Sequence, residues 1–265
     1  MKALRDWPLA ERGGVRGVLT DIDDTLTTEG AISPDALDAL TALKAAGLPV
    51  IAITGRPVGW SEPFAQCWPV EAIVAENGAV ALVRAAGGGL RKLYQQDEAL
   101  RQANHARMQQ VLQRIEAEVP GAHRSQDSRG RETDIAIDHS EFTGLPQAGI
   151  DRVVQLMRDE GMNATVSSIH INGWYGGHNK LSGARWIVGE LFGRVLDEEL
   201  DQWVYVGDST NDVLMFAHFP HSIGVANIRR FEAQLSHLPR YITTGERGAG
   251  FAEVAQALLA DRLRA

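Results

Sequence analysis

Residues 17–26 read GVLTDIDDTL, an apolar run that ends in three carboxylates within four positions. Residues 18–19 are typical of a short buried strand, and Asp21, Asp23 and Asp24 follow where that strand ends. Because side chains alternate faces along an extended chain, Asp21 and Asp23 can point to the same side. Crowded carboxylates repel one another unless a cation lies among them, so the stretch predicts a polar site. Asp and Thr are also common turn formers after strands, and the rest of the chain decides between the two interpretations.

The composition is typical of a globular protein with a large core. The chain has 265 residues, of which 44% are hydrophobic and 23% charged, enough for one large domain or two modest ones. No apolar run approaches the roughly 20 residues that cross a bilayer, and residues 1–14 lack a secretory core segment. We therefore expect a cytoplasmic location and no membrane partner. The net charge of -8, without a basic cluster, argues against nucleic acid as a partner. The single cysteine, Cys67, excludes an internal disulfide and is expected to be buried.

The first third of the chain predicts alternating strands and helices. A helix is expected over 32–47, with Ser33 as its N-cap. The near-continuous apolar run 48–54 predicts a second strand, and strand, helix, strand is the unit of a right-handed parallel crossover. A third strand over 72–75 is expected to return as a hairpin over 79–83.

From residue 84 the pattern changes. The glycine-rich residues 85–89 are expected to be a flexible joint. Beyond them, half-polar strands alternate with helices, which suggests an α+β layer whose sheet has one open face. We predict an inserted α+β cap domain over 84–176, which covers the strand ends of an α/β parallel-sheet core formed by 1–83 and 177–265. The predicted elements of the cap are a helix over 98–119, a strand over 133–138, a helix over 147–160 and a strand over 167–172.

Polar residues also follow the later predicted strands. Residues 54–56, Thr-Gly-Arg, offer a hydroxyl and free N–H groups that can hold a phosphoryl oxygen. Asp208 and Asp212 follow an apolar strand over 203–206. Because ligands bind at the carboxyl ends of parallel strands, these groups can converge in one crevice with Asp21. Hard oxygen ligands of this kind predict a Mg²⁺ site.

Lys180 precedes a helix expected over 181–191. Only four of the 26 basic residues are lysine, so the chain otherwise prefers arginine. A compact ammonium group suits a phosphoryl group flanked by carboxylates better than a planar guanidinium does. A helix start favours anions, so a surface lysine without a functional role is the weaker interpretation. A closing helix is expected over 249–263.

These segments resemble the four signatures of the haloacid dehalogenase superfamily of phosphohydrolases. The first, DxDxT[LV], stands at 21–26 as DIDDTL, and IAITGR at 51–56 is similar to the second. HNKLSGA at 178–184 resembles the lysine signature, and GDSTND at 207–212 the last. The resemblance covers nearly the whole chain and points to the subgroup with large α/β caps, which includes Cof-type, sucrose-phosphate and mannosyl-3-phosphoglycerate phosphatases. It implies a Rossmann-like parallel-sheet core with an inserted cap.

The resemblance also implies a reaction and residue roles. It implies a Mg²⁺-dependent phosphohydrolase that releases phosphate from a small phosphorylated metabolite, with a sugar phosphate as the expected class, through an aspartyl phosphate. Asp21 is the implied nucleophile and Asp23 the acid and base, with Thr54 and Lys180 as the other catalytic residues. The implied metal ligands are Asp21, Asp23 through its carbonyl, Asp208 and Asp212. The expected substrate contacts are Thr54, Gly55, Arg56, Asn77, Ser168, His170, Asn172 and Lys180.

Two other functions share these features. A phosphomutase of the same superfamily would carry all four motifs. A receiver-like phospho-acceptor module also groups acids, a hydroxyl and a lysine around Mg²⁺, without being an enzyme. Asp23 argues against a dehalogenase, which needs no acid at that position, and it is placed to speed hydrolysis of an acyl phosphate. The sequence carries no signal for an oligomeric state.

Overall fold

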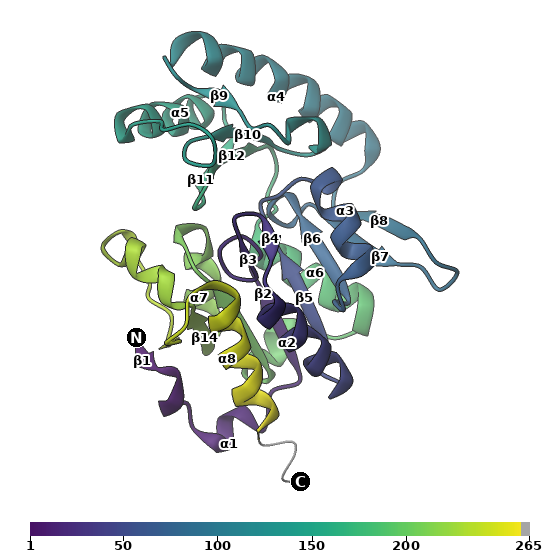
Figure 1. Ribbon diagram of the computed structural model, residues 1–265. Coiled ribbons are helices and arrows are strands. Elements are labelled where there is room, and N and C mark those ends of the chain that lie inside the picture. Colours follow the sequence, from purple (N-terminus) through teal and green to yellow (C-terminus); the bar gives the residue numbers. More distant parts are fainter. Residues whose placement is uncertain (261–265) are drawn as a thin grey trace.

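The apolar residues before the acidic stretch form strand β2 (Gly17–Thr20), all four of them buried. The computed structural model describes residues 1–260, and β2 lies at the centre of its larger, nine-stranded sheet (Figure 1). The other strands of this sheet are β1 (Lys2–Ala3), β5 (Val50–Ile53), β6 (Ala72–Ala75), β7 (Val80–Arg84), β8 (Leu90–Tyr94), β13 (Trp203–Gly207), β14 (His221–Gly224) and β15 (Tyr241–Ile242). Their order is β1-β15-β14-β13-β2-β5-β6-β7-β8. Neighbours from β1 to β6 in this order are parallel, as the sequence predicted, and β7 and β8 are antiparallel.

Helices cover both faces of this sheet, so the core has three layers. Its helices are α1 (Leu9–Arg12), α2 (Pro34–Ala45), α3 (Val58–Cys67), α6 (Lys180–Phe192), α7 (Val213–His218) and α8 (Arg247–Leu259). α2, α3 and α8 share a buried apolar cluster with Val18 and Ile22, whereas α6 and α7 share another with Leu19. The predicted cap of α2 is confirmed, because the Ser33 side chain accepts a hydrogen bond from Ala36 N. The last predicted residues of the closing helix, 261–263, lie outside the described residues.

A second, smaller unit lies above the larger sheet in Figure 1, and we call it the cap. Its elements are α4 (Glu98–Glu118), β9 (His123–Arg124), β10 (Ile135–Asp138), α5 (Gln147–Asp159), β11 (Asn163–Val166) and β12 (His170–Trp174). The strands form an antiparallel sheet in the order β11-β12-β10-β9. The two helices bury apolar residues such as Met108 and Leu156 against Ile171 and other residues of this sheet, in a cluster separate from those of the core. The fold is therefore a Rossmann-like α/β core with a cap.

Three local expectations differ from the structure. Residues 85–89 connect β7 to β8 as a hairpin instead of a joint to the cap, and β8, expected in the insertion, pairs with β7 in the large sheet. The strand expected over 167–172 begins only at His170, because β11 precedes it and the chain turns between the two. Cys67 is exposed, because the buried face of α3 is formed by Val58, Ser61 and Ala65.

The second face of the cap sheet is not open to solvent. All five residues of β12 are buried, and Asn172 Nδ2 donates a hydrogen bond of 3.3 Å to Gly55 O, just after β5. Thr210 Oγ1 donates to Val166 O of β11 at 2.7 Å. This face of the cap sheet therefore contacts the loops at the carboxyl ends of the core strands.

Glu76 fastens the cap to the core. It follows β6 with a left-handed backbone (φ 50°), and its carboxylate is fully buried. The carboxylate accepts hydrogen bonds from Val58 N of α3 (3.0 Å), Glu132 N (3.0 and 3.1 Å) and both Thr133 N and Thr133 Oγ1 (2.5 Å each). Burial raises the pKa of Glu76, while these donors favour its ionised form. One side chain thus satisfies donors from both units.

We predict that Glu76→Gln lowers the free energy of unfolding by about 3 kcal/mol, because the amide NH₂ would face N–H donors and leave them unsatisfied. Chemical denaturation of the purified variant measures this loss. Glu71→Gln is the matched control, since Glu71 is 37% exposed and pairs with Lys44 only at 3.8 Å. Equal stability of the Glu76→Gln and Glu71→Gln variants would contradict the assigned role.

His178 lies in the segment that leads from the cap back to α6. Its ring is buried, stacks on Trp174 with 5.6 Å between centroids, and has no hydrogen-bond partner within residues 1–260. Burial lowers the pKa of His178 to about 4. Because this value lies below that of the unfolded chain, His178 costs no stability above pH 6.5 and destabilises the fold as the pH falls toward 4.

We expect wild type to lose about 2 kcal/mol of stability through His178 between pH 7 and pH 5. His178→Phe, which keeps the contact with Trp174, should remove this part of the pH dependence. Unfolding curves of both proteins at the two pH values test the difference. The idea is wrong if the two proteins lose the same stability on acidification.

Candidate active site

Three carboxylates converge at the carboxyl ends of two neighbouring parallel strands. Asp21 follows β2 and Asp208 follows β13, and the Asp21 N–H donates to Val206 O at 2.9 Å across the pair. Asp212 ends the single helical turn after Asp208. One oxygen from each of Asp21, Asp208 and Asp212 lies within 4.8 Å of the others, and all three residues are buried. Distant parts of the sequence thus form one acidic cluster.

Lys180 supplies the nearest positive charge. It is the first residue of α6, and its Nζ lies 3.0 Å from Asp21 Oδ1 and 2.7 Å from Asp212 Oδ1. Its side chain is only 3% exposed. Burial disfavours the charged amine, but Asp21 and Asp212 outweigh it and raise the pKa of Lys180. Lys180 therefore stays protonated beside the two carboxylates.

One ammonium group does not balance three buried carboxylates. Burial raises the pKa of Asp21 to about 7, against the effect of Lys180, and the charges of Asp212 and Asp23 raise it further. Burial, with the charges of Asp21 and Asp212, also raises the pKa of Asp208 well above its ordinary value. The negative charge of the cluster is therefore only partly compensated by Lys180, and a further cation would stabilise it.

The donor set of the cluster fits a Mg²⁺ ion. Asp208 Oδ1 is buried and has no hydrogen-bond partner within residues 1–260. Asp212 is already engaged: its Oδ1 accepts from Lys180 and from Tyr205 Oη (2.5 Å), and its Oδ2 accepts from Asp208 N (2.9 Å) and Ser209 N (3.2 Å). Mg²⁺ prefers carboxylate oxygens and keeps several waters. Asp21 and Asp208 would hold such an ion directly, with Asp212 positioning the ligands around it.

Asp23 and Thr54 lie beside this cluster without joining it. The Asp23 carboxylate is 15% exposed and accepts from Arg56 Nε at 2.9 Å, so it faces a cavity and not the buried acids. Thr54 is fully buried directly after β5, the neighbour of β2. Its Oγ1 accepts from the Arg56 N–H at 3.0 Å. Both residues occupy the same edge of the sheet as Asp21.

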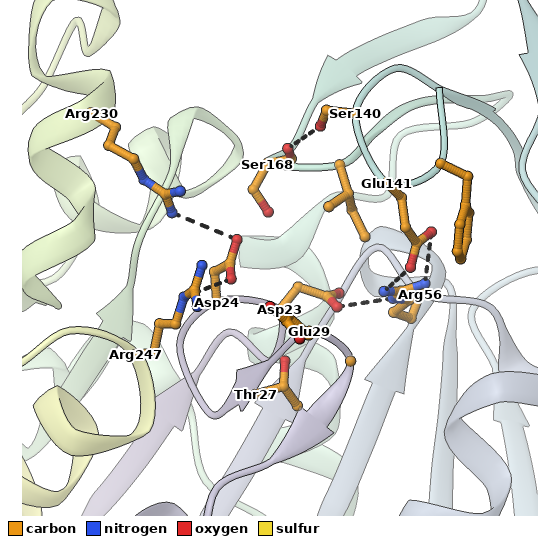
Figure 2. Close-up of a pocket in the computed structure, with 13 residues that line it drawn as sticks. Asp23, Asp24, Thr27, Glu29, Arg56, Ser140, Glu141, Ser168, Arg230 and Arg247 are labelled. Carbon is orange, nitrogen blue, oxygen red and sulfur yellow. Dashed lines mark hydrogen bonds and ion pairs between the residues drawn. The ribbon is translucent and has the colours of Figure 1, made fainter. Parts of the chain in front are cut away.

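Arg56, which is expected to contact substrate, lines the cavity beside Asp23 and is paired with carboxylates. Besides Asp23, its guanidinium binds Glu141 of the cap at 2.8 Å (Figure 2). It also lies 3.4 Å from Asp127 of the cap. The side chain is only 5% exposed. Arg56 therefore joins the core to the cap, and its charge is already neutralised. The nearby Gly55 carbonyl accepts from Arg131 Nη1 at 3.0 Å.

The other expected substrate contacts fall into two groups. Ser168 lines the cavity beside Asp23, and Asn77 lines a second cavity of about 370 Å³ together with Lys180. His170 and Asn172 are buried in the cap–core contact: His170 Nε2 lies 2.8 Å from Glu141 Oε2, and Asn172 Nδ2 donates to Asp134 at 3.0 Å. His170 and Asn172 are therefore already paired with carboxylates of the cap, and their contact with a substrate stays a prediction.

Asn77 and Lys180 line the same cavity because two glycines allow the turn that carries Asn77 to pack closely on α6. The turn at 76–78 rests on the start of α6, and a Cβ added to Gly78 would overlap the Asn179 carbonyl. Gly183 of α6 meets Gly78 in the same way. No larger residue could occupy either position without moving the turn.

Two further residues of the site were missed by sequence reasoning. Asn227, after β14, donates from Nδ2 to Asp208 Oδ2 at 3.1 Å and to Asp24 O at 2.9 Å. Tyr205, inside β13, donates to Asp212. Asn227 follows a strand of the parallel sheet, which is the same signal that identified Asp208. Tyr205 reads as an ordinary core residue, and nothing in the sequence singles it out.

Comparisons with known proteins find a matching family model and similar folds. Residues 18–124 match the model of the haloacid dehalogenase-like hydrolases. A comparison of the sequence with curated proteins found no match. Among solved structures, the chain is similar to a protein of Thermoplasma acidophilum (17% identity, TM-score 0.69, covering 92% of this chain and 98% of that one).

Two further solved structures share the fold. One is the sucrose-phosphatase of Synechocystis in complex with sucrose and phosphate, with 16% identity, a TM-score of 0.64 and coverage of 91% of this chain and 97% of that one. The other is a haloacid dehalogenase-like hydrolase from B. subtilis, with 14% identity, a TM-score of 0.61 and coverage of 91% and 99%. At these identities the likeness is one of fold.

We predict that Asp208→Asn raises the melting temperature of the metal-free protein by a few degrees, because it removes one of three repelling buried carboxylates. Mg²⁺ should raise the melting temperature of wild type after chelator treatment and leave that of Asp208→Asn unchanged. Thermal unfolding with and without Mg²⁺ measures both effects. A variant that still gains stability from Mg²⁺ as wild type does would rule out Asp208 as a ligand.

Proposed function

We propose that the chain is a haloacid dehalogenase-like hydrolase, since residues 18–124 match the model of that family, and that it acts as a Mg²⁺-dependent phosphohydrolase on a small phosphorylated metabolite. The observation that carries the proposal is the buried contact of 3.0 Å between Lys180 and Asp21, within the acidic cluster. A nucleophilic carboxylate needs a cation nearby if it is to approach a phosphate dianion. In this cluster Lys180 is one cation, and the carboxylates fit Mg²⁺ as a second. A cytoplasmic location remains part of this proposal.

In the first half of the reaction, a carboxylate oxygen of Asp21 attacks phosphorus. A bond forms between that oxygen and phosphorus, and the bond from phosphorus to the leaving oxygen breaks. Asp23 gives its proton to the leaving oxygen, which departs as an alcohol. Asp23 suits this role because it lies two residues from Asp21 and faces the cavity, where a leaving group has room.

In the second half, a water molecule attacks the phosphorus of the aspartyl phosphate. Asp23, now ionised, takes a proton from this water, and the bond between phosphorus and Asp21 breaks. Inorganic phosphate leaves and the Asp21 carboxylate is restored. The net reaction consumes one water and produces one alcohol and one phosphate, and each residue returns to its starting form.

The remaining residues hold the phosphoryl group and the charges around it. Lys180 and the Thr54 hydroxyl would bind phosphoryl oxygens, and Asp212 with Tyr205 keeps the Lys180 amine in place. When bound, Mg²⁺ would be held by Asp21 and Asp208 and would neutralise negative charge on the phosphoryl group. The metal role of the Asp23 carbonyl belongs to the same proposal.

Sugar phosphates are the first class of substrate to test. The Synechocystis protein with the similar fold is a sucrose-phosphatase solved with sucrose and phosphate. Another solved structure of similar fold, with 15% identity and a TM-score of 0.61, is a trehalose-6-phosphate phosphatase related protein. These names concern the other proteins, and they support the choice of a test panel for this chain.

We expect wild type to release phosphate from members of such a panel only with Mg²⁺. Asp21→Asn should abolish release, and Asp23→Asn should lower kcat by about 10²–10⁴-fold, since it removes the acid and base. A colorimetric phosphate assay measures both. Asp38→Asn, an exposed aspartate on α2, is the control and should behave as wild type. Full activity of Asp21→Asn would refute the mechanism.

The same assay separates the two alternatives. A phosphomutase would return the phosphoryl group to an organic acceptor, so product analysis with a sugar bisphosphate would show isomerised phosphate esters in place of inorganic phosphate. A receiver-like module would keep a long-lived acyl phosphate on Asp21 without turnover. Sustained release of inorganic phosphate excludes both.

A further inference from the structure

A cavity of about 440 Å³ lies between the first acidic loop and the cap (Figure 2). From the core it is lined by Asp23, Asp24, Thr27, Glu29, Gly30, Arg56, Arg230 and Arg247, and from the cap by Ser140, Glu141, Phe142, Ser168 and Ile169. An acid must reach the leaving oxygen to protonate it. Asp23 lines this cavity and not the second cavity, which Lys180 lines. The leaving group of a substrate would therefore lie in the first cavity.

The cavity wall carries two arginines that share one carboxylate. Arg247 Nε lies 3.0 Å from Asp24 Oδ1, and Arg230 Nη2 lies 3.6 Å from Asp24 Oδ2. Figure 2 shows both guanidinium groups directed at Asp24 from the same side. Arg56, on the opposite side, is consumed by three carboxylates. The Arg230–Asp24–Arg247 group therefore has one positive charge in excess.

Apart from the ion pair of Arg230 Nη2 with Asp24, the terminal nitrogens of the two arginines are available to bind a ligand. Within residues 1–260, the only side-chain hydrogen bond of Arg230 runs from Nε to Asn227 O at 3.3 Å, and the Arg247 side chain makes none with hydrogen-bond geometry. The Arg247 side chain of this group is 29% exposed and that of Arg230 50%. Guanidinium groups in this state offer paired N–H donors that match a carboxylate or a phosphate.

The backbone holds this group in place. Asp24 and Arg247 both have left-handed backbones, with φ of 54° and 52°. Such conformations are costly for residues other than glycine and persist where surrounding contacts enforce them. Asn227 enforces both, because its Oδ1 accepts from Arg247 N at 2.9 Å and its Nδ2 donates to Asp24 O at 2.9 Å. Asn227 also binds Asp208, so the arginines are fixed relative to the acidic cluster.

We propose that Arg230 and Arg247 bind a second anionic group, a carboxylate or a phosphate, on the leaving group of the substrate. The inference rests on the proposed function, which fixes where the leaving group lies. It narrows the substrate class to phosphate monoesters that carry a further acidic group. Ser140 and Ser168 line the same cavity, and their hydroxyls suit the polar part of such a molecule. Glu29, which is exposed, also lines this cavity.

The test compares pairs of compounds that differ only in the second anion. 3-Phosphoglycerate and glycerol 3-phosphate differ by a carboxylate in place of a hydroxymethyl group, and propanediol bisphosphate and propanediol monophosphate differ by a phosphate. Two quantities are measured: binding to Asp21→Asn, by calorimetry in Mg²⁺ buffer, and kcat/KM of wild type. In at least one pair, both should favour the compound with the second anionic group by about 10-fold or more. Which pair shows the larger preference identifies the anion.

Arg230→Gln and Arg247→Gln, each combined with Asp21→Asn for binding, should reduce that preference about 10-fold. Arg229→Gln is the matched control, because Arg229 neighbours Arg230 in sequence, is 64% exposed and, among the described residues 1–260, pairs only with Glu232. It should keep the preference. A circular dichroism melt checks that each variant is folded, and the ratio within one pair cancels general losses of activity.

The outcomes separate this inference from the proposed function. Equal affinity and equal kcat/KM within both pairs, or a preference that survives both arginine variants, overturns the inference even if phosphate is released. A preference in binding that depends on the arginines, without release of phosphate by wild type, supports the anion site and refutes the phosphohydrolase. A preference that is lost when Asn163 or Thr165 is substituted also overturns the inference, because both residues line the second cavity, beside Lys180.

Discussion

The structure depends on the cost of burying like charges. Asp21, Asp208 and Asp212 lie within ligand distance of one another beneath the cap, and Lys180 is the cation that contacts two of them. Two carboxylates ~4 Å apart repel by about 4 kcal/mol at an effective dielectric near 20. Clusters of buried carboxylates are found at sites that bind a cation, because a fold selected for stability alone would replace these acids by apolar residues. Tyr205, Asn227 and the α6 helix are placed to hold this cluster.

The cap is fixed to the core by polar contacts at the same edge of the sheet. Glu76 gathers donors from both units, and Arg56 joins Asp23 to Glu141 of the cap. Both residues follow core strands within a few positions of Thr54 and Asn77. The loops that build the site therefore also carry the cap, so a movement of the cap would change the surroundings of Asp23 directly. Asp23 would contact the leaving group directly, and it is linked to the cap through the guanidinium of Arg56.

Much of the fold follows from local patterns. Apolar runs of two to seven residues predicted β2, β5, β6 and β13 within a few residues, because a strand buried on both faces needs continuous apolar sequence. The exposed edges were harder. β8 has charged residues on both faces and joins the sheet only by pairing with β7. β11 (Asn163–Val166) was missed because it has no continuous apolar run and forms the edge of its sheet beside β12. Pairing between strands adds hydrogen bonds that no single segment reveals.

By itself, the sequence determined which residues meet at the carboxyl ends of the parallel strands, because a buried strand that ends in Asp or Thr can place that residue only at the sheet edge. The tertiary structure alone decided which of these groups are free to bind. Arg56 looks like an anion site in the sequence, yet cap carboxylates from about 70 and 85 residues away neutralise it. Arg230 and Arg247 look like surface charges, yet they share one aspartate at a cavity wall. Charge balance depends on distances in space, which a linear pattern does not contain.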